Sequence, residues 1–229
     1  MAGKTAILLG PTGLVGNYLL NLLLDDPDFL RIKIFHRREL ERHHEKLEQY
    51  VIDMDKLHLA KSDFTGTDVF CCLGTTMRKA GSKEAFRKVD YEYPLAAARL
   101  ALENKIPNFS IITAIGADPA SSIFYNKVKG EVEAEISKMP FQRTGIFRPS
   151  ILDGDRRETR MAEQFGLTMM KIFSFLMVGK LSKYKPIHGK TVATAMICFA
   201  VKDFQGLHIF ESDHIQALAR QSFYAPQPG

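Results

Sequence analysis

The sequence predicts an α/β protein with a doubly wound parallel sheet, a Rossmann fold, followed by a small C-terminal substrate-side extension. Three observations support this class. Apolar runs alternate with helical segments along the first 150 residues. A glycine-rich turn follows the first run directly. Several runs lack polar alternation, as strands buried on both faces do. Because helical crossovers are right-handed, such strands return to one parallel sheet.

The amino-terminal part supplies the first three predicted strands. Residues 4–10 (KTAILLG) form an apolar run that ends in glycine, and residues 14–24 continue as a helix. The second strand is RIKIF at residues 31–35, and a polar helical stretch is expected from Glu39. The third strand is QYVID at residues 49–53. This order of strand, turn, helix and strand defines a βαβ unit.

Three further strands and two helices complete the predicted sheet. The strands are DVFCCLG at 68–74, NFSIIT at 108–113 and TGIFRP at 144–149, where Pro149 stops the run. The helices are residues 91–104, with Pro94 tolerable near the start, and residues 121–139. Each helix is long enough to cross over between parallel strands.

The pattern loosens after Ser150. We expect a Met/Phe-rich helix within residues 161–179, another helix in residues 185–202 and a late strand at 206–211. The Met/Phe-rich helix fits a core or dimer surface, although methionine-rich surfaces also adapt to varied apolar ligands. We therefore expect a single domain over residues 1–229, in which residues 1–150 form the cofactor-binding core and residues 151–229 the substrate-side segment.

Composition excludes several classes of protein. The net charge is +5, but lysines and arginines are interspersed with acids, so no broad nucleic-acid surface is expected. Three cysteines, two of them adjacent, make neither a disulfide framework nor a zinc spacing. A reducing, cytoplasmic location fits this cysteine usage best. Histidines are scattered as well, and no metal site is expected.

One stretch has the length of a membrane span. Residues 5–24 carry no charge. Glycines and a proline interrupt its middle, whereas a spanning helix or a signal peptide is continuously apolar there. We therefore expect no membrane segment.

The turn LLGPTGLVG predicts a dinucleotide site. Gly10 permits the tight turn, Gly13 lets a pyrophosphate approach the backbone, and Gly16 lets the helix pack on the strand. The spacing is GxxGxxG, and no Lys-Ser/Thr pair follows, which disfavours a nucleotide triphosphate. The alternative is a simple tight connection. The residues expected to bind the cofactor here are Gly10, Thr12, Gly13, Leu14, Val15 and Gly16.

The end of the second strand distinguishes the two dinucleotides. An acid there would accept the ribose hydroxyl of NAD, but His36, Arg37 and Arg38 occupy the place. Guanidinium groups match a 2'-phosphate, so NADP (NADPH) is predicted, with Arg37 as first choice and Arg38 beside it. Solvated surface arginines are the alternative. Asp53 could accept a hydrogen bond from adenine or act as an ordinary turn residue.

The segment FYNKVKGEVE places Tyr125 four residues before Lys129, so both lie on one helix face. An ammonium group beside a phenol favours the phenolate, and such a phenol can move the proton that accompanies hydride transfer. Thr113, at the end of the preceding strand, offers a hydroxyl to the same crevice. A buried threonine at a strand end is the alternative for that residue.

These residues resemble the Ser/Thr, Tyr and Lys constellation of the short-chain dehydrogenase/reductase superfamily. The stretches CCLGTTMRKAGSKEAFRKVDYEYPLAAARLA, IGADPASSIFYNKVKGEVEAEI and FRPSIL resemble its atypical, Tat-interacting-protein-like branch, related to NmrA and the epimerases, which binds NADP(H). The resemblance implies that Lys129 also holds the ribose. It further implies cofactor contacts at Leu73, Gly74, Thr75, Tyr125, Lys129, Pro149 and Ile151.

Two positions depart from that branch: Thr113 stands where the group usually has serine, and Ala114 where a second serine is common. If the second hydroxyl is the working one, the triad is incomplete.

The resulting expectation is an NADPH-dependent oxidoreductase that delivers hydride to a carbonyl-like small molecule, with Thr113, Tyr125 and Lys129 as catalytic residues. The alternative is an NADPH-binding, redox-sensing regulator with little or no turnover. Nucleotide-sugar epimerisation is a third reading, weakened by the short C-terminal part. A homodimer is possible, and no nucleic acid or membrane partner is expected.

Overall fold

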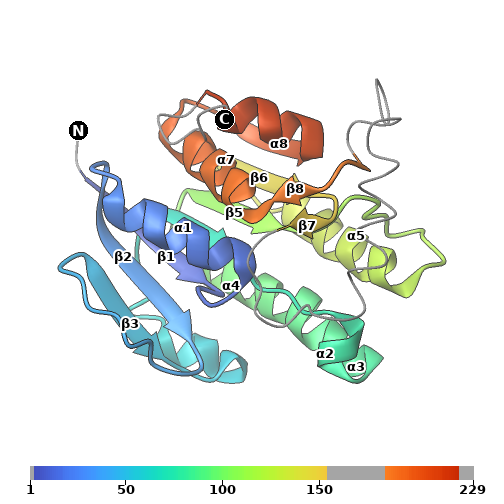
Figure 1. Cartoon of the computed structure of the whole chain (residues 1–229). Helices are drawn as coiled ribbons and strands as arrows, with labels where there is room; N and C mark the ends of the chain where they lie inside the picture. The colour runs from blue at the N-terminus through green and yellow to red at the C-terminus, as the bar shows by residue number, and fades with distance from the viewer. Residues whose placement is uncertain (1–2, 154–183, 222–229) are drawn as a thin grey trace.

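The computed structural model describes residues 3–153 and 184–221, and its centre is a seven-stranded parallel sheet in the order β3-β2-β1-β4-β5-β6-β9 (Figure 1). The strands are β1 (Lys4–Leu9), β2 (Phe29–His36), β3 (Leu47–Val51), β4 (Asp68–Cys71), β5 (Asn108–Ile112), β6 (Arg143–Arg148) and β9 (Gly206–Glu211). The predicted doubly wound parallel sheet is confirmed. Because the strand order reverses between β1 and β4, a crevice is expected at their carboxyl ends.

Helices cover both faces of this sheet. One face carries α1 (Leu14–Asp25), α7 (Gly189–Val201) and α8 (Ser212–Ala219). The other carries the 3₁₀ segment η1 (Met54–Ala60), α4 (Tyr93–Glu103) and α5 (Phe124–Ser137). Short elements after β4 are α2 (Met77–Ala80), α3 (Lys83–Arg87) and the π-helical turn η2 (Lys88–Glu92). A separate parallel pair joins β7 (Leu152–Asp153) to β8 (Ile187–His188).

The sequence pattern explains why the central strands are buried. β4 consists of DVFC and all four residues are buried, because β1 and β5 flank it and helices cover both faces. Alternate residues serve opposite layers: Phe70 packs with α1 and α7, whereas Val69 and Cys71 pack with α4 and α5. Continuous apolar runs were therefore the correct signal for these strands.

The helix predicted from Glu39 is wrong. Residues 37–46 form an irregular connection between β2 and β3. Side chains from elsewhere satisfy its backbone, since Gln49 hydrogen-bonds to the backbone of Leu40 and Arg42. Lys46 in turn donates to the carbonyl oxygens of Leu24 and Asp26 at the end of α1. These contacts replace the internal hydrogen bonds that a helix would have made.

The carboxyl-terminal part is integrated into the sheet. The late strand is confirmed as β9, which pairs in parallel with β6 along its full length. The helix predicted over 185–202 begins at Gly189, since residues 187–188 form β8. An added Cβ at Gly189 would lie 2.9 Å from Cγ of Leu14, so α7 packs very closely on α1. The predicted Met/Phe-rich helix at 161–179 lies outside the described residues.

A buried charge cluster fastens α7 to the amino end of the sheet. Arg143, at the start of β6, donates to Asp68 at 3.1 Å. It also donates to the carbonyl oxygens of Phe199, Ala200 and Lys202 at 3.1, 3.0 and 2.7 Å. Carbonyl groups at a helix end lack partners within the helix, so this guanidinium satisfies the end of α7.

The uncharged stretch of residues 5–24 divides between β1 and α1, with the glycine turn between them. Among the described residues, none of the helices combines the length and apolarity needed to cross a membrane.

Candidate active site and cofactor cradle

The turn between β1 and α1 is shaped by its glycines. Gly10 has φ +79°, the left-handed region that favours glycine. An added Cβ at Gly16 would lie 2.0 Å from the carbonyl oxygen of Gly10, so α1 approaches the turn too closely for a side chain. Gly13 caps the helix, and its amide donates to the Gly10 carbonyl oxygen at 3.1 Å.

The amino end of α1 is arranged to receive an anion. No side chain caps this end, and its first turn contains no acidic residue. The first amides of a helix lack partners within the helix, and the helix dipole favours negative charge there. Thr12 is exposed, Leu14 is half-buried and Val15 is buried at the same end. Backbone amides at this end therefore suit an anion such as a diphosphate.

The end of β2 presents two arginines and a buried histidine. Arg37 and Arg38 are exposed, while His36 is buried beneath them. Both ring nitrogens of His36 lack a hydrogen-bond partner among the described residues. Burial lowers the pKa of His36, which the Arg38 backbone and the Glu39 charge only partly oppose. Neutral histidine is therefore favoured here, and positive charge at this strand end comes from the arginines.

Asp53 caps η1. Its carboxylate accepts a hydrogen bond from the Asp55 amide at 3.1 Å, and the residue is exposed. Asp53 therefore acts as a turn residue, which was one of the two alternatives that the sequence allowed. The other, a contact with adenine, stays a prediction.

The loop after β4 is held from below by Asp90. The amide of Thr75 donates to Oδ2 of Asp90 at 2.9 Å. Gly74 is exposed, and an added Cβ there would lie 3.4 Å from Oδ1 of Asp90 and 3.7 Å from Nζ of Lys129. Leu73 is half-buried and packs against the α4–α5 layer. This loop therefore lies directly over the lysine that the sequence singled out.

Three side chains of the candidate site share one face of α5. Tyr125, Lys129 and Glu133 recur at four-residue spacing, which brings them into line on a helix. Tyr125 is half-buried, and its ring centroid lies 5.4 Å from that of Phe86 in α3. Lys129 and Glu133 are buried. The row therefore runs from a partly open tyrosine into the protein.

Lys129 forms a buried ion pair with Asp90 of η2. Their atoms Nζ and Oδ1 are 2.7 Å apart, and the two side chains are only 6% and 0% exposed. Burial alone would lower the pKa of Lys129, but the negative charge of Asp90 and the nearby Tyr125 outweigh burial and raise it. The ammonium therefore stays charged, next to both Tyr125 and the Gly74 loop.

Thr113 follows β5 and turns its hydroxyl inward. The hydroxyl donates to Oε1 of Glu133 and lies 3.4 Å from the Phe147 carbonyl oxygen. Nε of Arg148 donates to the same carboxylate at 3.0 and 3.1 Å. Thr113 is thus buried in a network that ties β5, α5 and β6 together, as the alternative for this residue predicted.

The position after Thr113 offers no hydroxyl to a substrate. Ala114 is half-buried but carries no hydroxyl. The structure therefore brings Tyr125 and Lys129 together, while the Thr113 hydroxyl is engaged with Glu133. A direct contact of Thr113 with a substrate carbonyl stays a prediction.

Two further predicted contacts lie at the end of β6. Pro149 is buried, and its carbonyl oxygen accepts from the Ile115 amide at 2.9 Å. Ile151 is 38% exposed and precedes β7. Both follow a carboxyl-terminal strand end, where ligands of such sheets bind.

Gly130 sets the distance between α5 and the loop after β5. An added Cβ there would lie 2.2 Å from the backbone carbon of Asp118 and from the nitrogen of Pro119. The loop therefore packs against α5 at the residue after Lys129.

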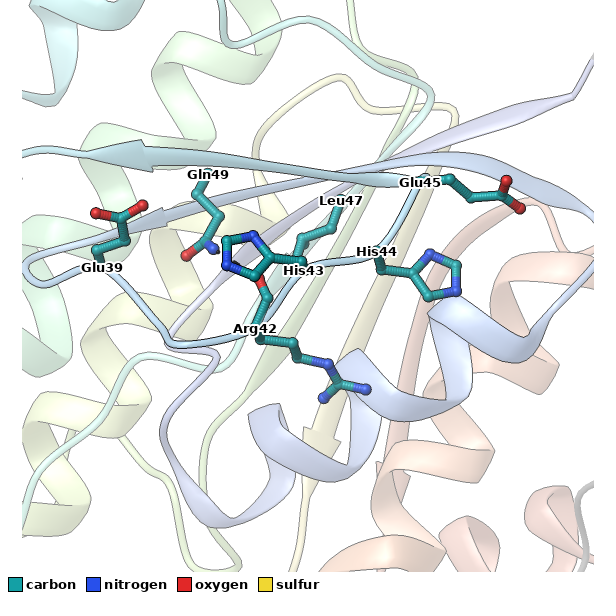
Figure 2. A pocket seen from close by; sticks show the side chains of 7 residues that line it. All are labelled: Glu39, Arg42, His43, His44, Glu45, Leu47 and Gln49. Carbon is teal, nitrogen blue, oxygen red and sulfur yellow. Dashed lines mark hydrogen bonds between the residues drawn. The ribbon is translucent and has the colours of Figure 1, made fainter.

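Figure 2 shows a polar pocket formed by other residues. It is lined by Glu39, Arg42, His43, His44, Glu45, Leu47 and Gln49, all from the β2–β3 connection and β3. Arg42 donates from this pocket to Asn21 of α1. None of its lining residues belongs to the predicted site. Within residues 3–153 and 184–221, no group of histidine, cysteine and acidic side chains is placed to hold a metal ion.

Sheet order, glycine turn and the Tyr125/Lys129 face place the chain in the Rossmann-type class of short-chain dehydrogenases and epimerases. Solved structures agree on the fold. WbmH of Bordetella bronchiseptica in complex with NAD+ superposes with a TM-score of 0.69 at 15% identity, over 95% of this chain and 80% of that one. The UDP-N-acetylglucosamine 4-epimerase of Methanobrevibacter ruminantium M1 gives 0.67 at 15% identity, over 92% and 77%.

Sequence relatives define the family. Protein HTATIP2 of Rattus norvegicus is 36% identical over 227 residues, which cover 97% of this chain and 92% of that protein. FMP52 of Coccidioides immitis, which is named mitochondrial, is 32% identical over 172 residues, covering 69% and 70%. No protein-family model matches the chain. The chain belongs to the HTATIP2/FMP52 family of atypical short-chain dehydrogenase/reductase-like proteins, as the sequence resemblance predicted.

Sequence reasoning missed Asp90, Gly130, Glu133 and Arg148. A signal existed for Glu133, because it continues the four-residue spacing of Tyr125 and Lys129. Asp90 lies shortly before an apolar helix, and nothing in the local sequence pattern connects it with Lys129. Its role appears only when η2 packs under the β4 loop.

Proposed function

We propose that this protein is an NADP(H)-dependent oxidoreductase that reduces a carbonyl-like small molecule, with Tyr125 as its acid/base. One observation carries the proposal. The buried, charged Nζ of Lys129 lies beside Tyr125 and 3.7 Å from where a Cβ of Gly74 would stand. A proton-transferring phenol and the loop expected to touch the cofactor thus meet at one ammonium group.

Each residue of the site has a proposed role in this reaction. The nicotinamide, when bound, supplies the hydride that reaches the carbonyl carbon. Tyr125 donates its hydroxyl proton to the carbonyl oxygen, and Lys129 stabilises the phenolate that is left. Lys129 also offers N–H donors to the cofactor ribose. The amides at the start of α1 hold the diphosphate, and Phe86 packs against the tyrosine ring and limits its movement.

Arg37 and Arg38 support the choice of NADP over NAD. They are exposed at the end of β2, where the adenosine ribose of such folds lies. The first acidic residue after β2 is Glu39, which follows the two arginines, and buried His36 supplies little positive charge. A 2'-phosphate would therefore meet two guanidinium groups before that carboxylate.

A second candidate is an NADPH-responsive regulator with little turnover. The observation that favours it is the Thr113 hydroxyl, which donates to Glu133, while Ala114 carries no hydroxyl. A carbonyl substrate would then be held by Tyr125 and by groups outside this triad. Cofactor binding requires neither the Thr113 hydroxyl nor a hydroxyl at position 114. The glycine turn and the start of α1 are therefore compatible with both candidates.

Two measurements separate these candidates. The first is a thermal-shift titration with NADPH and with NADH, since a ligand that binds only the folded state raises its melting temperature. A larger response to NADH would overturn the arginine argument, and no response to either would overturn both candidates.

The second is NADPH oxidation with a panel of quinones, aldehydes and ketones, with Tyr125→Phe as the matched control. Turnover that is lost in the control, with NADPH affinity retained, supports the enzyme. Absence of turnover across the panel supports the regulator.

The compartment and the partners belong to the same proposal. FMP52 relatives are named mitochondrial, whereas cysteine usage favours a reducing, cytoplasmic location. We retain the cytoplasm as a proposal, tested by imaging the tagged full chain against markers of both compartments. A small molecule is the proposed partner, and a homodimer is tested by light scattering.

A further inference from the structure

Asp90 joins two parts of the proposed site that are far apart in sequence. Its Oδ2 accepts the Thr75 amide hydrogen at 2.9 Å, and its Oδ1 lies 2.7 Å from Nζ of Lys129. The side chain is fully buried within the π-helical turn η2. One carboxylate therefore fastens the β4 loop to α5.

The pair also changes the charge that Tyr125 meets. Burial without a counterion would lower the pKa of Lys129 and favour the neutral amine. The Asp90 carboxylate at contact distance keeps the ammonium charged, so the phenol lies beside an ion pair. Buried charges are poorly screened, so the loss of either partner would change the charge near Tyr125.

Among the described residues, Lys129 and Asp90 form the ion pair next to Tyr125. The titratable groups around Lys129 are Asp90 from η2, Tyr125 from α5 and Cys71 from β4. Burial raises the pKa of Cys71 to about 12, so its thiol is neutral at physiological pH. The net charge next to Tyr125 thus depends on the Lys129 ammonium and the Asp90 carboxylate.

We propose that Asp90 is a positioning residue: its carboxylate offsets the charge of Lys129 beside Tyr125 and ties the Gly74–Thr75 loop to that lysine. The proposal rests on the proposed role of Tyr125. It adds that proton transfer and cofactor binding are tuned by a residue that touches neither substrate nor the reacting atoms.

Two variants separate charge from attachment. Asp90→Asn removes the negative charge but keeps an oxygen that can accept the Thr75 amide. Asp90→Ala removes both. Asp90→Glu is the charge-retaining comparison, since it keeps a carboxylate in altered geometry.

The charge is tested by NMR titration of the side-chain carbons of Lys129, assigned by comparison with Lys129→Met. Lys129 should lose its proton about one pH unit lower in Asp90→Asn than in wild type, because burial then acts without the counterion. The same midpoint in both proteins would overturn the proposal, because a merely structural carboxylate would alter stability alone. If the asparagine variant does not fold, Asp90→Ala provides the same test.

The attachment is tested by NADPH affinity. Asp90→Ala should bind NADPH about tenfold more weakly, because a buried amide of the loop loses its acceptor. Asp90→Asn should stay within about threefold of wild type, a difference of well under 1 kcal/mol. Equal losses in both variants would overturn the role of the Thr75 contact.

The titration needs neither substrate nor cofactor. If no dinucleotide binds and nothing is turned over, the proposed function fails while the shift of the Lys129 titration still reports on Asp90. If turnover is found but the Asp90→Asn titration is unchanged, only the present inference fails.

Discussion

Thr113 donates its hydroxyl hydrogen to Glu133, four residues beyond Lys129 on α5. The hydroxyl expected to meet a substrate is thus used to hold the helix that carries Tyr125. Arg148 completes the contact from the end of β6. The network fixes the face of α5 on which the proposed chemistry depends.

Replacing Thr113 tests this assignment. Thr113→Val keeps the shape but removes the donor to a buried carboxylate, so we expect a loss of about 1–3 kcal/mol in the free energy of unfolding. Thr113→Ser keeps the hydroxyl and should lose less. Urea denaturation measures both. If valine were as stable as wild type, the hydrogen bond to Glu133 would contribute nothing.

Gly130→Ala should disturb the site through the loop after β5. Alanine gains about 1 kcal/mol in helix propensity. The added Cβ meets backbone atoms of Asp118 and Pro119 at 2.2 Å, which cannot rotate away. We expect a net loss on the order of 1–3 kcal/mol and weaker NADPH binding. Ser137→Ala, on the same helix, is the control, and a stabilised Gly130→Ala protein would contradict the contact.

Arg143→Met should destabilise the whole fold. The change leaves Asp68 and the carbonyl groups at the end of α7 without their buried partner. Breaking a buried ion pair costs about 3–5 kcal/mol. Arg99→Met on the exposed side of α4 should stay within about 0.5 kcal/mol of wild type. Chemical denaturation compares the two, and similar midpoints would argue against the cluster.

The free energy of unfolding should depend on pH through His36. Burial lowers the pKa of this histidine in the folded state below 6.5, so the unfolded chain binds more protons in that range. Its contribution to stability is present above about pH 6.5 and is lost as the pH falls through the folded pKa. His36→Leu should therefore lose less stability than wild type between pH 7.5 and 5.5. His58→Leu, at an exposed position, should behave as wild type does.

Paired replacement of Arg37 and Arg38 by serine should change cofactor preference. Loss of charge-assisted hydrogen bonds costs about 1.5–3 kcal/mol, so NADPH affinity should fall about 10- to 100-fold. NADH lacks the 2'-phosphate and should bind as before. Arg31→Ser, at an exposed position earlier on β2, provides the control in calorimetric titrations. A parallel loss for both nucleotides would remove the arginines from phosphate recognition.

The strands were predictable because their local pattern and their environment agree. β1 and β4 are mainly apolar runs, and both lie inside the sheet. The connection after β2 was not predictable, because helix-forming residues such as Glu41 and Lys46 are held in an irregular path by partners from α1 and β3. Those partners become neighbours only in the folded chain.

The candidate site shows the same division. Tyr125 and Lys129 share a helix and are found by spacing, and Gly10 is found by its place after a strand. The Lys129–Asp90 pair joins segments separated by the helix α4 and the strand β5, so no local period reveals it. Thr113 was placed correctly at its strand end, but the direction of its hydroxyl depends on Glu133 and Arg148.

The close packing of Leu14 against Gly189 has a consequence for synthesis on the ribosome. α1 leaves the exit tunnel early, whereas α7 and β9 emerge near the end of translation. Until then the apolar surface of α1 that α7 covers stays open to solvent, and β6 remains an unprotected edge. We expect nascent chains to engage chaperones during this interval, and chains cut short before Gly189 to aggregate or be degraded.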